Sequence, residues 1–409
     1  MAAPSPTSGN GDAPAWRECQ PPAMQLLLAC LTGQPWKNGI DRPGWGEFLR
    51  LAERHKVSAL AARGLQMTGL QPVPDEVHQR MAQAHRDQVR RCLSQVRELL
   101  RLLPALAEAG AGALPLKGPA LSQQLYGDPC VRHSGDIDLL VDPAGIGRAD
   151  DLLIASGYTR LRPDFAPDDP RWAAFCHIIH HAVYGRPGSA PLELHWRLHP
   201  MRRLQPVAVS ELLDTAGHVT FAGIRFPVLD PVDQLLFLAG HGARHNWFRL
   251  AWLCDIPALL AQMDEGQQRA AQRRAQKLGL ERPLALALLM ARRALAMPIP
   301  ASLDTAALRD PVVGKLMVTA HNAITANAGK PALYPVKLFR IRLQSKLRLK
   351  RQLGYKLECV KIFLVDWRDV NALRLPVTLH FLYVLLRPVS WLRRRLQHWI
   401  PAAAGVIKK

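Results

Sequence analysis

The 409-residue chain carries 53 Lys and Arg against 33 Asp and Glu, which gives a formal net charge of +20. Its hydrophobic content of 48% excludes an intrinsically disordered protein, and its length allows two or three domains. The seven cysteines are scattered and include no Cys-x-x-Cys, which argues against a disulfide framework or a zinc site and for reduced thiols in the cytoplasm. We expect no signal peptide, because no basic segment followed by an apolar stretch opens the sequence.

The first region of the chain is predicted to be helical after a short tail. Residues 1–15 are small, polar and rich in Pro and Gly, so we expect a disordered tail. Over residues 16–103, apolar side chains such as Trp45 and Phe48 recur at helical spacing. A longer helix is expected over about 76–103. We predict an N-terminal helical lobe that packs on a catalytic core and carries no chemistry of its own.

An α/β core is predicted over residues 104–230, and its first part has features of a phosphate site. A short apolar strand (113–116) is followed by Lys117 and Gly118, and Pro119 suits the first turn of a helix. A glycine at this point lets a phosphate approach the backbone N–H groups, and the lysine adds a positive charge. Arg132, in the Gly/Asp/Pro loop that follows the helix, is placed to donate two hydrogen bonds to a phosphate.

Two acidic strands are the most informative part of the core. On a strand over 136–141, Asp136 and Asp138 project from the same face. Paired carboxylates repel each other and lose solvation unless a cation joins them, and Mg²⁺ or Mn²⁺ suits such oxygen ligands. The alternative is that they are solvated residues at a strand end. Glu193, which shares a strand face with His195, would complete a three-carboxylate, two-metal site.

The connecting segments give a mixed α/β arrangement. Asp142 is expected to cap a helix over 144–155, and 160–171 is expected to form a Pro/Asp loop. Residues 176–184 are interpreted as a strand that turns at 186–189 into the Glu193 strand, so His177, His180 and His181 are interpreted as strand residues. A short hairpin is expected over 221–228.

The segments LKGPAL, YGDPCVRHSGDIDLLV and LELHW together resemble the nucleotidyltransferase superfamily that includes DNA polymerase β. More narrowly, they are similar to the bacterial family of uncharacterised nucleotidyltransferases. The resemblance identifies Asp136, Asp138 and Glu193 as the metal-binding and catalytic carboxylates. Lys117-Gly118-Pro119 stands where the superfamily has Gly-Gly or Gly-Ser, although it suits the narrower family.

The resemblance implies an α+β fold, in which a small mixed-sheet nucleotidyltransferase core is flanked by N- and C-terminal helical regions. It also implies Mg²⁺-dependent transfer of a nucleoside monophosphate from an NTP to a hydroxyl of an unidentified acceptor, with Lys117, Gly118 and Arg132 holding the nucleotide. The alternative function is a non-catalytic binding module of the same fold that docks on membrane or nucleic acid through a basic tail.

Helices are predicted again over 231–330, where His241 and His245 are one turn apart. The spacing is similar to that of zinc proteases, but Gly242 stands where that chemistry needs a glutamate. We interpret the pair as satisfying hydrogen bonds in the core or lining the nucleotide cleft, where His195 is a further candidate.

The last region, residues 331–409, carries 17 Lys and Arg against 3 Asp and Glu. Its uncharged stretch Leu375–Leu386 is 12 residues long, too short to cross a bilayer. Three interpretations remain open for this basic tail: contact with the anionic inner face of the membrane, a packed helical subdomain with a basic outer face, or nucleic-acid binding. We favour the packed subdomain, and we expect a cytoplasmic protein with at most peripheral membrane contact.

Overall fold

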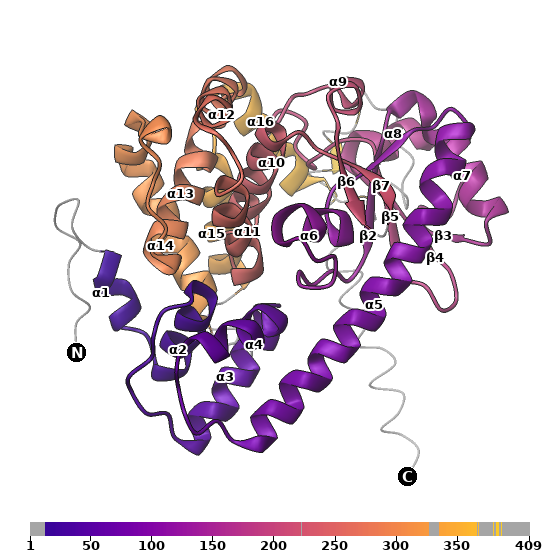
Figure 1. The fold of residues 1–409 in the computed structure, drawn as a ribbon. Helices are drawn as coiled ribbons and strands as arrows, with labels where there is room; N and C mark the ends of the chain where they lie inside the picture. The colour runs from indigo at the N-terminus through magenta and orange to yellow at the C-terminus, as the bar shows by residue number, and fades with distance from the viewer. Residues whose placement is uncertain are drawn as a thin grey trace, which may run out of the picture.

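The computed structural model describes residues 13–221, 223–326 and 335–365, together with residues 367, 379, 382, 383 and 386. Residues 1–12 of the expected disordered tail lie outside the described residues, and so does most of Leu375–Leu386. The predicted fold class is confirmed: a five-stranded mixed sheet is flanked by helices that precede and follow it in the chain (Figure 1).

The N-terminal region is helical, as predicted. Its helices are α1 (Ala13–Glu18), α2 (Pro22–Thr32), α3 (Arg42–Arg54), α4 (Ser58–Met67) and α5 (Asp75–Glu108). Asp75 and Glu76 in the first turn of α5 are favourable next to the positive end of the helix dipole. At 34 residues, α5 is long enough to extend from these helices to the sheet, so the two regions share one rigid element (Figure 1).

The sheet has the strand order β1-β2-β5-β4-β3. Its strands are β1 (Ala113–Pro115), β2 (Ile137–Val141), β3 (Thr159–Arg162), β4 (His181–Gly185) and β5 (Leu192–His195). The β2–β5 pair is parallel, whereas the other three pairs are antiparallel. The two predicted acidic strands are therefore neighbours at the centre of the sheet.

One face of the sheet is covered by α5 and by α7 (Ile146–Ala155). A 3-10 helix, η1 (Pro143–Gly145), leads into α7, and Asp142 caps it by accepting a hydrogen bond from the backbone N–H of Ala144 at 2.9 Å. Apolar residues from the helices and strands form one core on this face: Leu99, Leu102, Leu106, Leu153, Ile137, Leu139, Val141, Leu192 and Leu194. Since neighbouring strand residues alternate, the other face receives Asp138, Glu193 and His195.

Two local predictions in the core are wrong. Residues 159–162 form the edge strand β3, not a loop, and three of its four side chains are exposed, so no alternation marked it as a strand. Cys176–Ile178 belongs to helix α8 (Trp172–Ile178), so only the later part of the expected strand 176–184 is extended and His177 is a helix residue. Burial of Phe175 and Ile178, three residues apart on one helix face, favours the helix.

The helical region after the core begins with α9 (Val209–Asp214) and a hairpin. The expected hairpin 221–228 is present but starts earlier, since β6 (Gly217–Phe221) pairs with β7 (Ile224–Val228) in a separate two-stranded sheet. The helices that follow are α10 (Pro231–Arg244), α11 (Leu250–Leu260), α12 (Glu265–Leu278), α13 (Glu281–Leu295) and α14 (Pro311–Thr325), with 3-10 helices η2 (Ala301–Leu303) and η3 (Ala306–Arg309).

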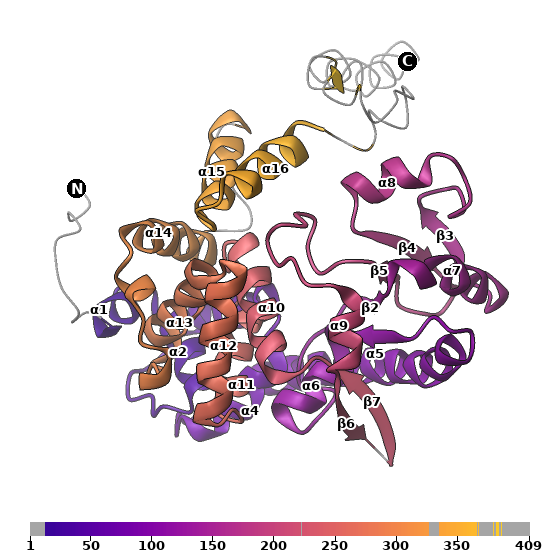
Figure 2. The same cartoon turned by 90° about the horizontal axis from the view of Figure 1, so that it is seen from above.

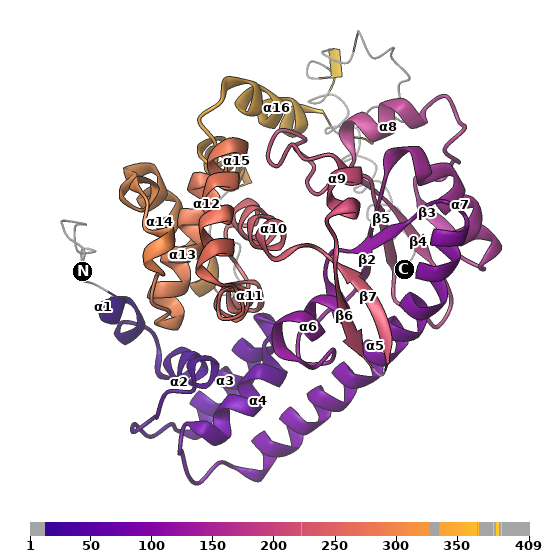
Figure 3. The same ribbon diagram turned by 45° about the horizontal axis from the view of Figure 1, so that its top comes forward.

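Helices from both ends of the described chain share one hydrophobic core. Leu27 of α2 and Phe48 of α3 belong to the same buried cluster as Leu253 of α11 and Leu288 of α13. Figures 2 and 3 show the helices α10–α14 gathered on one side of the molecule and the sheet with α5 and α7 on the other. The polar face of the sheet therefore faces the region between these two halves.

The described part of the basic tail packs on this helical core. It forms α15 (Pro335–Arg348) and α16 (Leu353–Leu364), and Leu349, Tyr355 and Cys359 are fully buried in the cluster. The Lys350 ammonium donates to the carbonyls of Arg203, Leu204 and Leu278 at 2.6, 3.1 and 2.6 Å. Among the described residues, no helix is both long and apolar enough to span a bilayer.

Candidate functional site

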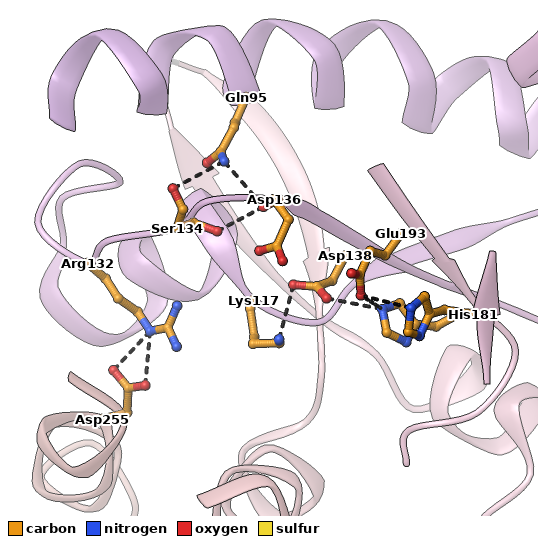
Figure 4. Close-up of polar contacts among 10 residues, drawn as sticks. Gln95, Lys117, Arg132, Ser134, Asp136, Asp138, His181, Glu193 and Asp255 are labelled. Atoms are coloured by element: carbon orange, nitrogen blue, oxygen red, sulfur yellow. Dashed lines mark hydrogen bonds and ion pairs between the residues drawn. The ribbon is translucent and has the colours of Figure 1, made fainter. Parts of the chain in front are cut away.

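The parallel pairing of β2 with β5 brings the predicted carboxylates together. Asp138 is directly opposite Glu193 in the strand register, so both side chains lie on the same face. Asp136 precedes β2 by one residue, and Figure 4 shows its carboxylate on the same side of the strand as that of Asp138. The prediction that Asp136 and Asp138 share a face is therefore confirmed by their placement.

Helix α5 fixes the backbone that carries Asp136. The side-chain amide of Gln95 donates to the carbonyls of Ser134 and Asp136 at 3.4 and 3.2 Å, and Ser134 Oγ donates to the Asp136 carbonyl at 2.8 Å. Gln88, two turns earlier on α5, donates to the Arg132 carbonyl at 3.0 Å. The loop before β2 is thus held by two buried glutamines that sequence reasoning missed; their positions on the buried side of a helix were the available signal.

Burial and neighbouring charges shift the pKa values of the two aspartates in opposite directions. Burial, and then the charge of Asp138, raise the pKa of Asp136 to about 6. The pKa of Asp138 is lowered, because the attraction of Lys117 and His195 outweighs its burial. Asp138 is 4% exposed, whereas the Glu193 side chain is 26% exposed and is the more accessible of the two.

A lysine and a histidine contact the carboxylates directly. Lys117 Nζ lies 3.2 Å from Asp138 Oδ2, and Figure 4 shows the lysine directed at this carboxylate. His195 Nε2 lies 3.1 Å from Asp138 Oδ1 and 3.2 Å from Glu193 Oε2. The pKa of His195 is raised in spite of its burial, because both carboxylates accept from its ring. The sequence-predicted Lys117 and His195 are therefore part of the carboxylate cluster.

The Lys117–Gly118 turn requires glycine. Gly118 has φ +73°, a left-handed conformation that side chains disfavour, and it opens α6 (Gly118–Tyr126) with Pro119 in the first turn. The backbone N–H of Leu116 donates to the Asp138 carbonyl at 3.1 Å, so the turn is tied to β2. The helix N-terminus thereby lies next to the carboxylates.

Arg132 is held by an ion pair that the sequence did not reveal. Its Nε donates to both carboxylate oxygens of Asp255 on α11, at 3.0 and 2.9 Å, and the two side chains are 5% and 0% exposed. Tyr126 donates to the same carboxylate at 3.2 Å. In Figure 4 the terminal nitrogens of Arg132 lie on the side of Lys117, whereas Asp255 lies on the other side.

Helix α10 contributes a second set of cationic and aromatic groups. The His241 and His245 rings lie 4.8 Å apart and both contact Trp252. Arg244, which sequence reasoning missed, is within electrostatic range of Glu193 and Asp138, although burial lowers its pKa to about 10. His241 Nε2 has no hydrogen-bond partner among the described residues, and its pKa is lowered by burial and then by Lys117. The sequence signal for Arg244 was its position three residues after His241, on the same helix.

Gly242 has a packing role. A Cβ at this position would lie 2.4 Å from the Trp247 ring, so no larger residue fits. The helix that carries His241 and His245 therefore has no room for the glutamate of a zinc protease.

The cluster suits a divalent cation. Asp138, Glu193 and His195 each offer one ligand atom, and these atoms lie within 4.8 Å of one another. Asp136 lies beside this group, and burial followed by the charge of Asp138 raises its pKa, so its negative form lacks a full counter-charge. Two strand carboxylates with a third beside them are the hard oxygen donors that Mg²⁺ and Mn²⁺ accept.

Comparison with known proteins shows the family of the chain. A family model described as uncharacterised nucleotidyltransferase matches residues 41–296. This span starts at Asp41, the N-cap of α3, and ends at Ala296, the C-cap of α13, so it contains the sheet, α10 and α11. No curated protein and no solved structure matches the chain.

Proposed function

Because the chain belongs to the uncharacterised nucleotidyltransferase family, we propose that it transfers a nucleoside monophosphate from an NTP to a hydroxyl of an acceptor, with Mg²⁺ or Mn²⁺ as cofactor. The observation that carries this proposal is the register of Asp138 and Glu193 across the central parallel strand pair, with Asp136 beside them. The acceptor is any molecule with a reactive hydroxyl that fits the cleft.

Asp136, Asp138 and Glu193 are the proposed metal ligands. When bound, a divalent cation would stabilise the negative charge that develops on the phosphate during transfer. His195 supports this arrangement by donating from Nε2 towards the carboxylates, which fixes their orientation. Lys117, now 3.2 Å from Asp138, is close enough to exchange that contact for a phosphate oxygen.

The nucleotide phosphates are proposed to bind between the start of α6 and α10. The backbone at Gly118 and the Lys117 ammonium would contact the phosphates, and Arg244 on α10 adds a positive charge within electrostatic range of Glu193 and Asp138. Arg132, anchored by Asp255, directs its terminal nitrogens towards the Lys117 side of the cleft. His241 and His245 line the same region from α10.

In the proposed reaction the acceptor oxygen attacks the α-phosphorus of the NTP. A new P–O bond forms while the bond from the α-phosphorus to the α,β-bridging oxygen breaks, and pyrophosphate leaves. The proton of the acceptor hydroxyl passes to a carboxylate, for which Glu193 is the most suitable because it is the more accessible residue of the facing pair. We propose that residues 104–230 supply this chemistry and that residues 16–103 and 231–330 frame the cleft.

The experiment is a transfer assay with each of the four labelled NTPs, in which fractionated cell extract supplies acceptors. We expect label transfer that requires Mg²⁺ or Mn²⁺ and is lost in Glu193→Gln, while calorimetry shows that this variant still binds the nucleotide. Glu211→Gln, on α9, is the matched control and should behave like the unaltered protein. Equal NTP affinity in EDTA and in Mg²⁺ would contradict the metal-dependent reaction.

A further inference from the structure

Three histidine rings gather beside the carboxylate cluster. His180 and His181 contact each other with ring centroids 4.4 Å apart, and they lie 5.3 and 4.9 Å from the ring of His195. One ring nitrogen from each of the three lies within 4.8 Å of the other two. His181 is paired with His195 in the β4–β5 register, and His180 joins them because the chain bends between α8 and β4.

The spacing of one pair of these nitrogens, which are within hydrogen-bond distance of each other, also matches that of metal ligands. The Nδ1 atoms of His180 and His181 are 3.3 Å apart. Two nitrogens bonded at the usual 2.0–2.1 Å to a tetrahedral Zn²⁺ are separated by about 3.3 Å. Imidazole ligands favour first-row transition metals such as Zn²⁺ and Co²⁺, whereas Mg²⁺ prefers oxygen. The chemistry of this trio therefore differs from that of the neighbouring carboxylates.

His195 supplies the second, independent observation. It is only 4% exposed, and its Nδ1 has no hydrogen-bond partner among the described residues, whereas its Nε2 lies beside Asp138 and Glu193. A histidine that binds a metal through one ring nitrogen commonly donates the other N–H to a carboxylate. We propose that His180, His181 and His195 bind a transition-metal ion of the zinc class, with His195 contributing Nδ1 and anchored by the carboxylates through Nε2.

Arg162 competes with metal binding at His181, which provides a variant that tests the proposal. Its Nη2 lies 2.6 Å from His181 Nε2, so that nitrogen accepts and the ring proton is on Nδ1. Metal binding through His181 Nδ1 moves the proton to Nε2, and Arg162 must then turn away. Glu193 Oε2, 3.7 Å from the same nitrogen, becomes the acceptor. Since Arg162 is an exposed residue of β3, its removal should favour the metal without disturbing the core.

The test uses the full-length protein, freed of metal by a chelator and titrated with Co²⁺ in the absence of nucleotide. We expect one equivalent of Co²⁺ to give the intense visible absorption of a four-coordinate, nitrogen-ligated ion. His180→Ala and His181→Ala should each raise the Kd about 100-fold or more, since loss of an outer-shell partner alone costs about 10–100-fold. Arg162→Met should lower the Kd.

Two controls separate this site from its surroundings. His177→Ala, which removes a nearby histidine on α8, and Asp136→Asn, which alters the carboxylate cluster, should leave the Co²⁺ spectrum unchanged. Circular dichroism verifies the fold of each variant. If an alanine variant does not fold, Arg162→Met tests the proposal instead. A Co²⁺ Kd in Arg162→Met equal to that of the unaltered protein overturns the proposal.

Two other outcomes also overturn the proposal. One is a Co²⁺ Kd in the folded alanine variants equal to that of the unaltered protein. The other is weak absorption typical of six-coordinate Co²⁺ that Asp136→Asn removes, which would place the ion at the carboxylates. The proposal is independent of nucleotidyl transfer. A normal Co²⁺ site with no transfer activity would reject only the proposed reaction, and metal-dependent transfer without the Co²⁺ site would reject only the histidine site.

Discussion

Arg132 and Asp255, 123 positions apart in the chain, form a fully buried ion pair that joins the loop before β2 to helix α11. The contact fixes the guanidinium, and Figure 4 shows its terminal nitrogens on the side of Lys117, away from Asp255. It also couples the sheet to the helical half of the molecule, because the two partners belong to different halves.

We predict that Asp255→Ala destabilises the protein by about 3–5 kcal/mol, because it leaves a buried guanidinium without a counter-charge. Urea unfolding measures this loss. The double variant Arg132→Met/Asp255→Leu replaces both charges with apolar groups and should recover most of the stability. It should bind NTP more weakly than the unaltered protein, because the Arg132 guanidinium is lost. A loss below about 1 kcal/mol in the single variant would show that the pair is not the link between the halves.

The affinity of the carboxylates for Mn²⁺ should depend on pH through Asp136. Its pKa of about 6 in the metal-free protein means that this carboxyl is neutral below pH 6 and negative above it. Because the proton and the metal compete, the affinity for Mn²⁺ should fall as the pH decreases through 6 and level off above it. Calorimetric titrations between pH 5 and about 8 measure the effect. Asp136→Asn should bind more weakly at all pH values and lack the inflection near 6.

Gly118→Ala should weaken nucleotide binding. The left-handed φ of +73° costs a residue with a side chain roughly 1–2 kcal/mol, and the turn can relax only by moving the N-terminus of α6. Gly127→Ala is the matched control, since Gly127 has φ +66° at the opposite end of the same helix and open space around it. Both variants should lose similar stability, whereas only Gly118→Ala should raise the Kd for NTP. Equal effects on binding would remove Gly118 from the nucleotide site.

The described part of the basic tail should be required for stability. Deleting residues 335–409 removes the buried Leu349, Tyr355 and Cys359 and the three hydrogen bonds of Lys350, so we expect a large decrease in melting temperature. Deletion of 387–409 alone is the control and should cost much less, because it retains Trp367 and the buried Tyr383. Vesicle sedimentation with both chains then tests peripheral contact: if the 387–409 deletion already abolishes binding to anionic lipid, the contact belongs to that last segment.

The sequence by itself determined the local geometry of the site. Alternation along a strand depends only on the backbone, so Asp136 and Asp138 had to share a face and Glu193 had to share one with His195. The Gly118–Pro119 pair likewise predicted a helix start, because only glycine adopts the required φ readily and proline suits the first turn. The fold class followed from the alternation of helical and strand patterns and from the family resemblance.

The tertiary structure alone decided which distant groups meet. Strand register sets Asp138 opposite Glu193, and it depends on pairing between segments more than 50 residues apart that no local pattern encodes. The short segment around Cys176 was predicted to be a strand, but it belongs to helix α8, whose Phe175 is buried in the aromatic core. The bend between α8 and β4 brings His180 to His181 and His195. The packing of α10 and α11 within the helical half, with α11 against α6, brings Arg244 and Asp255 near the carboxylates. These placements result from burial of apolar surface over several helices, which no local pattern encodes.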